Sequence, residues 1–186
     1  MSSHHIVREN QEPALVILDA HAIPFEKVQE LLEWMPAIIV LHSQIETVLG
    51  WGIKVDAVLV PTGEEAVWID RTKDQQPIEV VSFHSEESAI GKAISFLQSR
   101  NIPAVNWLAS DRQILLVLTD FNGDIEVFIE GTRWSRVKSG RFAKWLPAGT
   151  VLQVFPEIFS DKNFFVGQEG ILNLEANQPF WIGEAL

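Results

Sequence analysis

The chain has 186 residues, of which 47% are hydrophobic and 21% are charged, so it can bury a core in one large domain or two small ones. The absence of cysteine excludes disulfides, thiolate catalysis and zinc sites with cysteine ligands. The formal net charge of −11 repels nucleic-acid backbones and anionic membranes, and we expect neither as a partner.

Targeting and membrane signals are also weak. No apolar run approaches the roughly 20 residues that a membrane-spanning helix needs. The start, Met1 to Gln11, has no apolar signal-peptide core, so we expect a cytoplasmic location.

The first half alternates the patterns of buried strands and amphipathic helices. Branched apolar runs predict strands at 14–18, 37–41, 55–60, 78–83 and 102–108. Helical spacing and caps predict helices over 24–35, 43–50 and 86–100, the last of them capped by Ser85. The polar segment 70–77 is predicted as a loop. This alternation predicts an α/β domain with a mostly parallel sheet and helices on its faces.

After residue 110 the apolar period changes to two. Short strands are predicted at 114–119, 125–130, 133–138, 141–146, 150–155, 170–174 and 179–182. Asn122-Gly123 predicts a hairpin between the first two, and Ser139-Gly140 predicts another between the next two. The pattern indicates a C-terminal antiparallel β-sandwich. We therefore expect two domains, 1–110 and 111–186.

In an open α/β sheet, ligands bind at the carboxyl ends of the strands, so the turns after the strands are informative. None of these turns is a phosphate-binding glycine loop or a nucleophile elbow. They do contain histidines and acids that could form a mixed metal site, namely His21, His42, His84, Glu64, Glu65, Glu86 and Glu87. The alternative, which we favour, is solvated loop histidines and acids at helix starts.

A second cluster is basic and has no acid among its members, which are Arg133, Arg136, Lys138, Arg141 and Lys144. If Ser139-Gly140 is a two-residue turn, Trp134 faces Trp145 across the hairpin. Such a ribbon could grip a phosphate or stack a flat ring. The alternative, which we favour, packs both tryptophans into the sandwich and balances the charges against an acidic partner subunit or domain.

The order of these pieces resembles that of thiamine pyrophosphokinases over nearly the whole chain. Gly52–Val60 is similar to that family's "G-I-x-P-D-x-I-I-G" approach to its metal site, and Phe142–Pro147 resembles its "S-L-I-P" strand. The resemblance implies an α/β domain followed by a β-sandwich, a homodimer, and transfer of pyrophosphate from ATP to thiamine. It also implies Mg²⁺ held by aspartates.

The residues that carry this chemistry differ here. The family's Asp-Gly turn is His42-Ser43, its Gly-Asp-x-Asp-Ser motif places Thr62 and Glu64 at the two aspartates, and its Thr-Asp pair is Ser88-Ala89. The Gly-Gly-Arg-x-Asp-His segment has no counterpart. Magnesium prefers hard oxygen ligands in near-octahedral geometry, so these changes should remove most of the metal site.

Three functions stay open: an inactive or altered relative that binds a nucleotide or thiamine-like ligand, an active kinase with a rebuilt metal site, and a dimeric interaction protein without a small ligand. Through the resemblance, an active enzyme would use ATP and Mg²⁺. We then expect catalytic roles for Glu64 and Glu65, and metal binding by Glu64 and Glu86. The expected nucleotide-binding residues are His42, Thr62, His84 and Ser88, and the expected substrate-binding residues are Trp134 and Trp145.

Overall fold

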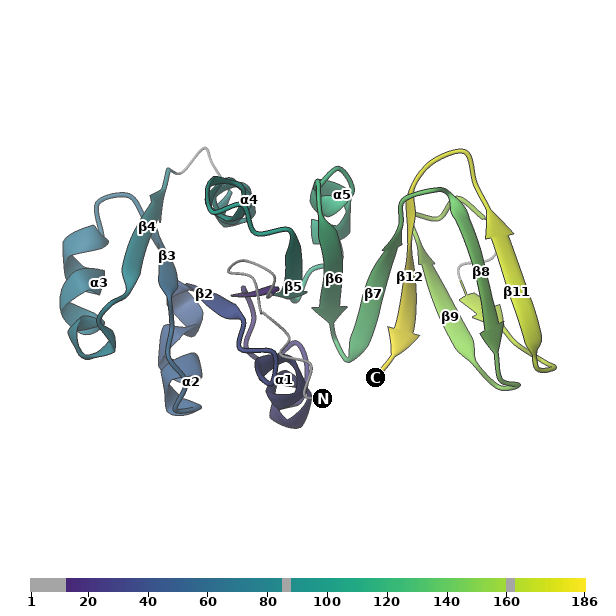
Figure 1. The fold of residues 1–186 in the computed structure, drawn as a ribbon, viewed down its shortest axis with the longest axis horizontal. Coiled ribbons are helices and arrows are strands. Elements are labelled where there is room, and N and C mark those ends of the chain that lie inside the picture. Colours follow the sequence, from purple (N-terminus) through teal and green to yellow (C-terminus); the bar gives the residue numbers. More distant parts are fainter. Residues whose placement is uncertain (1–12, 85–87, 160–162) are drawn as a thin grey trace, which may run out of the picture.

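The structure is a computed structural model that describes residues 13–84, 88–159 and 163–186. Its centre is a ten-stranded sheet in the order β10-β9-β12-β7-β6-β5-β1-β2-β3-β4, beside a two-stranded sheet of β8 and β11. Figure 1 shows the helices gathered on the N-terminal half of the molecule and the strands alone forming the C-terminal half. The fold is therefore mixed α/β with C-terminal antiparallel strands, as predicted.

The N-terminal half is a parallel sheet covered on both faces. Its strands are β1 (Ala14–Ile17), β2 (Ala37–Leu41), β3 (Ala57–Pro61), β4 (Glu79–Phe83) and β5 (Ala104–Leu108). Neighbouring strands in the order β5-β1-β2-β3-β4 all pair in parallel. All four residues of β1 are fully buried, which explains why this strand is a run of apolar residues without alternation. The predicted parallel sheet is confirmed.

Two sets of helices cover the two faces of this sheet. The helices are α1 (Phe25–Leu32), α2 (Ile45–Gly50), α3 (Glu65–Arg71), α4 (Ala89–Ser99) and α5 (Ile114–Leu118), with 3₁₀ turns η1 (His42–Gln44) and η2 (Lys73–Gln75). Residues of α1, α2 and α3 belong to one buried cluster, and residues of α4 and α5 belong to another on the opposite face. Each helix thus buries one apolar stripe against the strands.

Two sequence predictions about helices in the N-terminal half were wrong. The polar segment 70–77 was predicted as a loop, yet α3 continues to Arg71 and η2 follows it. The helix predicted from residue 86 begins at Ala89, and its N-cap is Ser88, whose Oγ accepts the Gly91 N–H at 3.0 Å. The predicted cap Ser85 lies outside the described residues.

The largest error concerns the first strand predicted after residue 110, which is helix α5. Ile114, Leu115 and Leu118 are buried while Leu116 and Val117 are each 51% exposed, a helical rather than an alternating pattern. Asn122-Gly123 therefore joins a helix to β6 (Asp124–Ile129) and is no hairpin turn. Strand β6 pairs in parallel with β5, so the main sheet continues past residue 110. The domain boundary near that residue stays a prediction.

Beyond β6 the sheet becomes antiparallel and acquires a second layer. The remaining strands are β7 (Thr132–Val137), β8 (Arg141–Leu146), β9 (Val151–Phe155), β10 (Asn163–Phe165), β11 (Gly170–Glu175) and β12 (Phe180–Ala185). A third buried cluster, which includes Leu146, Leu174 and Phe180, draws residues from both sheets. Strand β7 pairs with β6 and β12, whereas β8 pairs with β11, so the hairpin predicted at Ser139-Gly140 is wrong.

Arg136 on β7 joins the two halves. Its Nη1 donates to the carbonyl oxygens of Leu118, Thr119 and Phe121 at 3.1, 2.7 and 2.7 Å, and its Nη2 donates to that of Gly123 at 2.7 Å. These carbonyls belong to the end of α5 and the turn before β6. Burial lowers the pKa of the Arg136 guanidinium, with opposing contributions from Asp124 and Asp120.

Replacing Arg136 by Met should lower the free energy of unfolding by about 2–5 kcal/mol, because partly buried carbonyls lose a charged donor. The matched control is Arg133→Met on the same strand, which removes a 3.5 Å ion pair with Glu184 and should cost at most about 1 kcal/mol. Urea denaturation measures both. Equal losses of unfolding free energy in the two variants would contradict the role of Arg136 in linking β7 to the turn before β6.

Candidate functional site at the carboxyl edge of the sheet

The turns after β1, β2, β3 and β4 lie at one edge of the sheet because these strands are parallel. The side chain of Gln44 links two of these turns, since its Oε1 accepts the backbone N–H of Ala20 at 3.0 Å. Sequence reasoning missed this residue. Its contact joins positions 24 residues apart, and no local pattern signals such a contact.

Thr62 and His84 form a polar pair at the ends of β3 and β4. The Thr62 hydroxyl lies 3.1 Å from the Phe83 carbonyl oxygen and 3.2 Å from His84 Nδ1. Because the hydroxyl has a single proton, donation to the carbonyl leaves its lone pairs to accept from Nδ1–H. In that arrangement Nε2 of His84, an exposed residue, is the ring nitrogen that can accept a hydrogen bond. The structure thus brings together two residues that were predicted to contact a nucleotide.

The two acids after β3 are hydrogen-bonded within their own segment. Glu64 Oε2 accepts from Trp68 Nε1 at 3.1 Å, one helical turn further along α3. Glu65 Oε2 accepts from the backbone N–H of Gly63 at 2.7 Å. The Glu65 backbone N–H, the Ser82 hydroxyl and the Gly63 N–H hold the pKa of the Glu65 carboxyl below its ordinary value, and the charge of His84 lowers it further.

His42 contacts Trp68, the residue whose indole also bonds to Glu64. Its ring meets the Trp68 ring edge to face, with centroids 5.5 Å apart. Among the described residues, no group hydrogen-bonds to its buried Nδ1. His42, Glu64 and Trp68 therefore form one contiguous group, in which the tryptophan contacts both polar residues.

The other predicted site residues do not join this group in the described part of the chain. Ser88 serves as the N-cap of α4, and Glu86 lies outside the described residues. Within the described ranges, no three histidine, aspartate or glutamate side chains are placed to hold a metal ion. The functional roles predicted for these residues stay predictions.

The basic cluster and its tryptophans are arranged differently from the predicted ribbon. Trp134 is fully buried on β7, whereas Trp145 on β8 is 57% exposed, so they do not face each other. The predicted sharing of one hairpin face is therefore wrong. The favoured alternative, in which both tryptophans pack into the sandwich, is wrong for Trp145, because its side chain is exposed. Lys138, Arg141 and Lys144 pair with Asp124, Glu175 and Glu184 of the same chain. Sequence reasoning expected an acidic partner subunit or domain to balance these positive charges. At these three residues, acids of the same chain balance them instead.

The described residues contain no helix that is long and apolar enough to cross a membrane. The arrangement defines a class of protein: a parallel α/β sheet whose carboxyl edge presents polar turns, continued by an antiparallel β half. Neither a family model nor a curated protein matches the sequence.

Solved structures identify the fold within this class. Thiamine pyrophosphokinase from Bacillus subtilis is similar with a TM-score of 0.65 and 10% identity, over 94% of this chain and 99% of that one. Yeast thiamin pyrophosphokinase has a TM-score of 0.63 and 8% identity, over 98% of this chain and 88% of that one. The enzyme from Candida albicans has a TM-score of 0.63 and 7% identity, with 94% and 89% covered. The chain has the thiamine pyrophosphokinase fold.

The lowered pKa of Glu65 gives a pH-dependent prediction. Its folded-state stabilisation is present above the unfolded carboxyl pKa of about 4.3 and is lost as the pH falls through the lower folded value. Glu65→Gln should therefore lower the Tm at pH 7, and the difference from wild type should shrink by pH 3. The control is Glu46→Gln, an exposed acid on α2. A difference that is constant with pH would contradict the prediction.

Proposed function

We propose that this protein binds a nucleotide or thiamine-like ligand at the carboxyl edge and does not transfer pyrophosphate. The observation that carries the proposal is the state of the acids after β3. Glu64 and Glu65 are engaged by Trp68 and Gly63 in local hydrogen bonds, rather than converging on a common point. Glu64 and Glu65 in this arrangement do not fit an octahedral Mg²⁺ site, because such a site needs several oxygen ligands around one point.

The polar groups at this edge still suit a ligand with acceptor oxygens. Thr62 and His84 are exposed and adjacent. Between Thr62 and Glu64, Gly63 has a φ of +95°, a backbone conformation that glycine adopts readily. Because none of these turns is a phosphate-binding glycine loop, the ligand must be bound mainly by side chains. We therefore expect modest affinity, with His84 as the main contact.

Isothermal titration with a non-hydrolysable ATP analogue, with and without Mg²⁺ and thiamine, tests this proposal. We expect binding that Mg²⁺ changes little, and no thiamine diphosphate when ATP and thiamine are supplied. His84→Ala should weaken binding about tenfold, which corresponds to one or two lost hydrogen bonds, while His21→Ala after β1 should leave it unchanged.

Other outcomes identify the alternatives. Product formation that is lost in Glu64→Gln would support an active kinase with a rebuilt metal site and overturn the proposal. No binding and no thermal shift with any nucleotide would favour an interaction protein.

We also propose a homodimer that uses the β half. Trp145 and Ile171 pair across β8 and β11 and are 57% and 66% exposed, and Val151 and Phe165 pair across β9 and β10 with 50% and 71% exposed. Exposed apolar side chains gathered on neighbouring strands are typical of a contact surface. Each pair lies on strands of the β half and outside the candidate site.

Trp145→Ser should weaken the dimer by at least about tenfold, because a large aromatic anchor is removed. Analytical ultracentrifugation measures the dissociation constant. Trp34→Ser is the matched control, since Trp34 is 70% exposed on the N-terminal half. A wild-type monomer, or equal effects of both variants, would contradict this assignment.

A further inference from the structure

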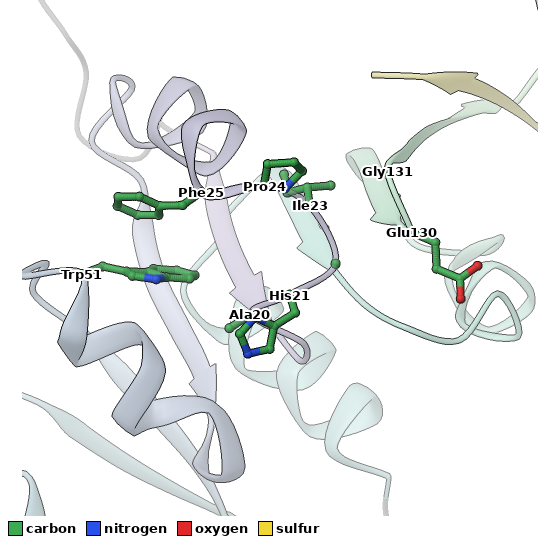
Figure 2. Close-up of a pocket in the computed structure, with 9 residues that line it drawn as sticks. Ala20, His21, Ile23, Pro24, Phe25, Trp51, Glu130 and Gly131 are labelled. Carbon is green, nitrogen blue, oxygen red and sulfur yellow. The ribbon is translucent and has the colours of Figure 1, made fainter.

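Two cavities of the molecule differ in whether charged side chains meet an apolar surface. In the pocket beside the β1–α1 loop, Figure 2 shows the rings of Phe25 and Trp51 together and the Glu130 carboxylate pointing away from them. A second cavity, of about 560 Å³, lies between the starts of β2, β3 and β4 and the end of α4. There, charged side chains and an apolar floor line the same space.

This amino-edge cavity lies away from the candidate site. Strands β2, β3 and β4 are parallel, so their first residues meet at one edge of the sheet and their last residues at the opposite edge. Asp56 and Glu79 line the cavity just before β3 and at the start of β4, whereas Thr62 and His84 follow the ends of these strands. Binding in the cavity therefore does not rest on the nucleotide binding proposed at the carboxyl edge.

The floor of the cavity is aliphatic. Ile39 is fully buried at its base, and Ala37 and Ile102 are partly buried around it. The ring of Phe96 also lines the cavity, but the guanidinium of Arg100 lies over that ring, with Cζ 5.3 Å from its centroid. A ligand therefore meets aliphatic side chains, because Arg100 already covers a face of the aromatic ring.

Two of the three charged side chains in the lining neutralise each other. Arg100 follows the last residue of α4, and its Nη2 pairs with Oε2 of Glu79 at the start of β4. This ion pair links the helix to the sheet beside the cavity. The charge that is left without a partner in the lining belongs to Asp56.

The carboxylate of Asp56 is held in a fixed position. Its Oδ2 accepts the Ile38 N–H at 2.8 Å, and the Asp56 backbone bonds to Ile38 on one side and to Glu79 on the other, each at 2.9 Å. Among the described residues, Asp56 makes no ion pair and its Oδ1 has no hydrogen-bond donor. An oriented, unpaired carboxylate of this kind suits a positively charged N–H donor.

We propose that this cavity binds a primary aliphatic amine. The ammonium donates to Oδ1 of Asp56, and the hydrocarbon chain lies on Ala37 and Ile102. A charge-assisted hydrogen bond fixes the head, and removal of the chain from water stabilises the rest of the ligand. The overall charge of −11 raises the local concentration of cations.

Titration of the full chain with n-hexylamine at pH 7 and 0.15 M salt, followed by the NMR shifts of backbone amides, tests the proposal. At this pH an alkylamine is protonated, as lysine is. We expect saturable shifts around Ile38 and Asp56, with a Kd at or below about 5 mM. Hexan-1-ol, which lacks the charge, and methylamine, which lacks the chain, should each bind at least about threefold more weakly.

Two variants separate the charge from the floor. Asp56→Asn keeps an oxygen for the Ile38 N–H and removes the charge, so it should weaken hexylamine binding about three- to fivefold. The matched control is Asp111→Asn, because Asp111 Oδ1 likewise accepts a backbone N–H, that of Gln113 at 2.8 Å, but lies beyond the other end of β5. This control should leave the Kd unchanged. Ala37→Val adds two methyl groups at the floor and should weaken hexylamine binding more than methylamine binding.

Several results would overturn the proposal. They are the absence of saturable binding by wild type, equal affinity for hexan-1-ol, and shifts confined to residues away from the cavity. An unchanged Kd in a folded Asp56→Asn would do the same. If Asp56→Asn does not fold, an Ala37→Val variant that binds hexylamine as wild type does would overturn the proposal on its own.

Discussion

One guanidinium, that of Arg136, bonds to the turn through which the chain passes from α5 into β6. The chain leaves β5 at Leu108, makes the short helix α5 and enters β6 at Asp124. The carbonyls at the end of a helix have no intrahelical donor. From the neighbouring strand β7, Arg136 donates to the oxygens of Leu118 and Thr119 at the end of α5 and to those of Phe121 and Gly123 in the turn before β6. The Trp181 Nε1–H bond to Thr119 Oγ1 at 3.1 Å supports the same turn from β12. The strands that follow the turn thereby hold it in place.

The arrangement of the strands and the side chains at the carboxyl edge must be considered separately. The arrangement of strands is that of the thiamine pyrophosphokinases, yet identities of about a tenth leave room for a different set of side chains at the carboxyl edge. Glu64 and Glu65 bond to neighbours in their own segment, and Thr62 pairs with His84. A scaffold of this kind can host several activities, so the side chains must be tested one by one.

Much of the first half could be predicted because buried parallel strands are long apolar runs flanked by polar turns. The five apolar residues of α5 contain no polar position that would reveal their period, so a helix and a strand were equally compatible with them. Ser139-Gly140 does form a turn, with Gly140 at φ +70°, but its two strands enter different sheets. Local turn chemistry cannot specify that partner choice. The Glu64–Trp68 bond follows helical spacing and was predictable in principle, whereas the contact of Gln44 with Ala20 was not.

The hydrogen-bonded pairing of β5 with β6 also limits how the molecule can respond to a ligand. Strands β5 and β6 pair from Ala104 with Asp124 to Leu108 with Phe128, directly between the helical half and the all-β half. A hinge between the halves would have to break this ladder, so closure of the two halves around a ligand, as in a clamshell, is not available to this fold. Capture and release must instead come from rearrangement of the turns at the sheet edge, on the faster timescale of loop motion.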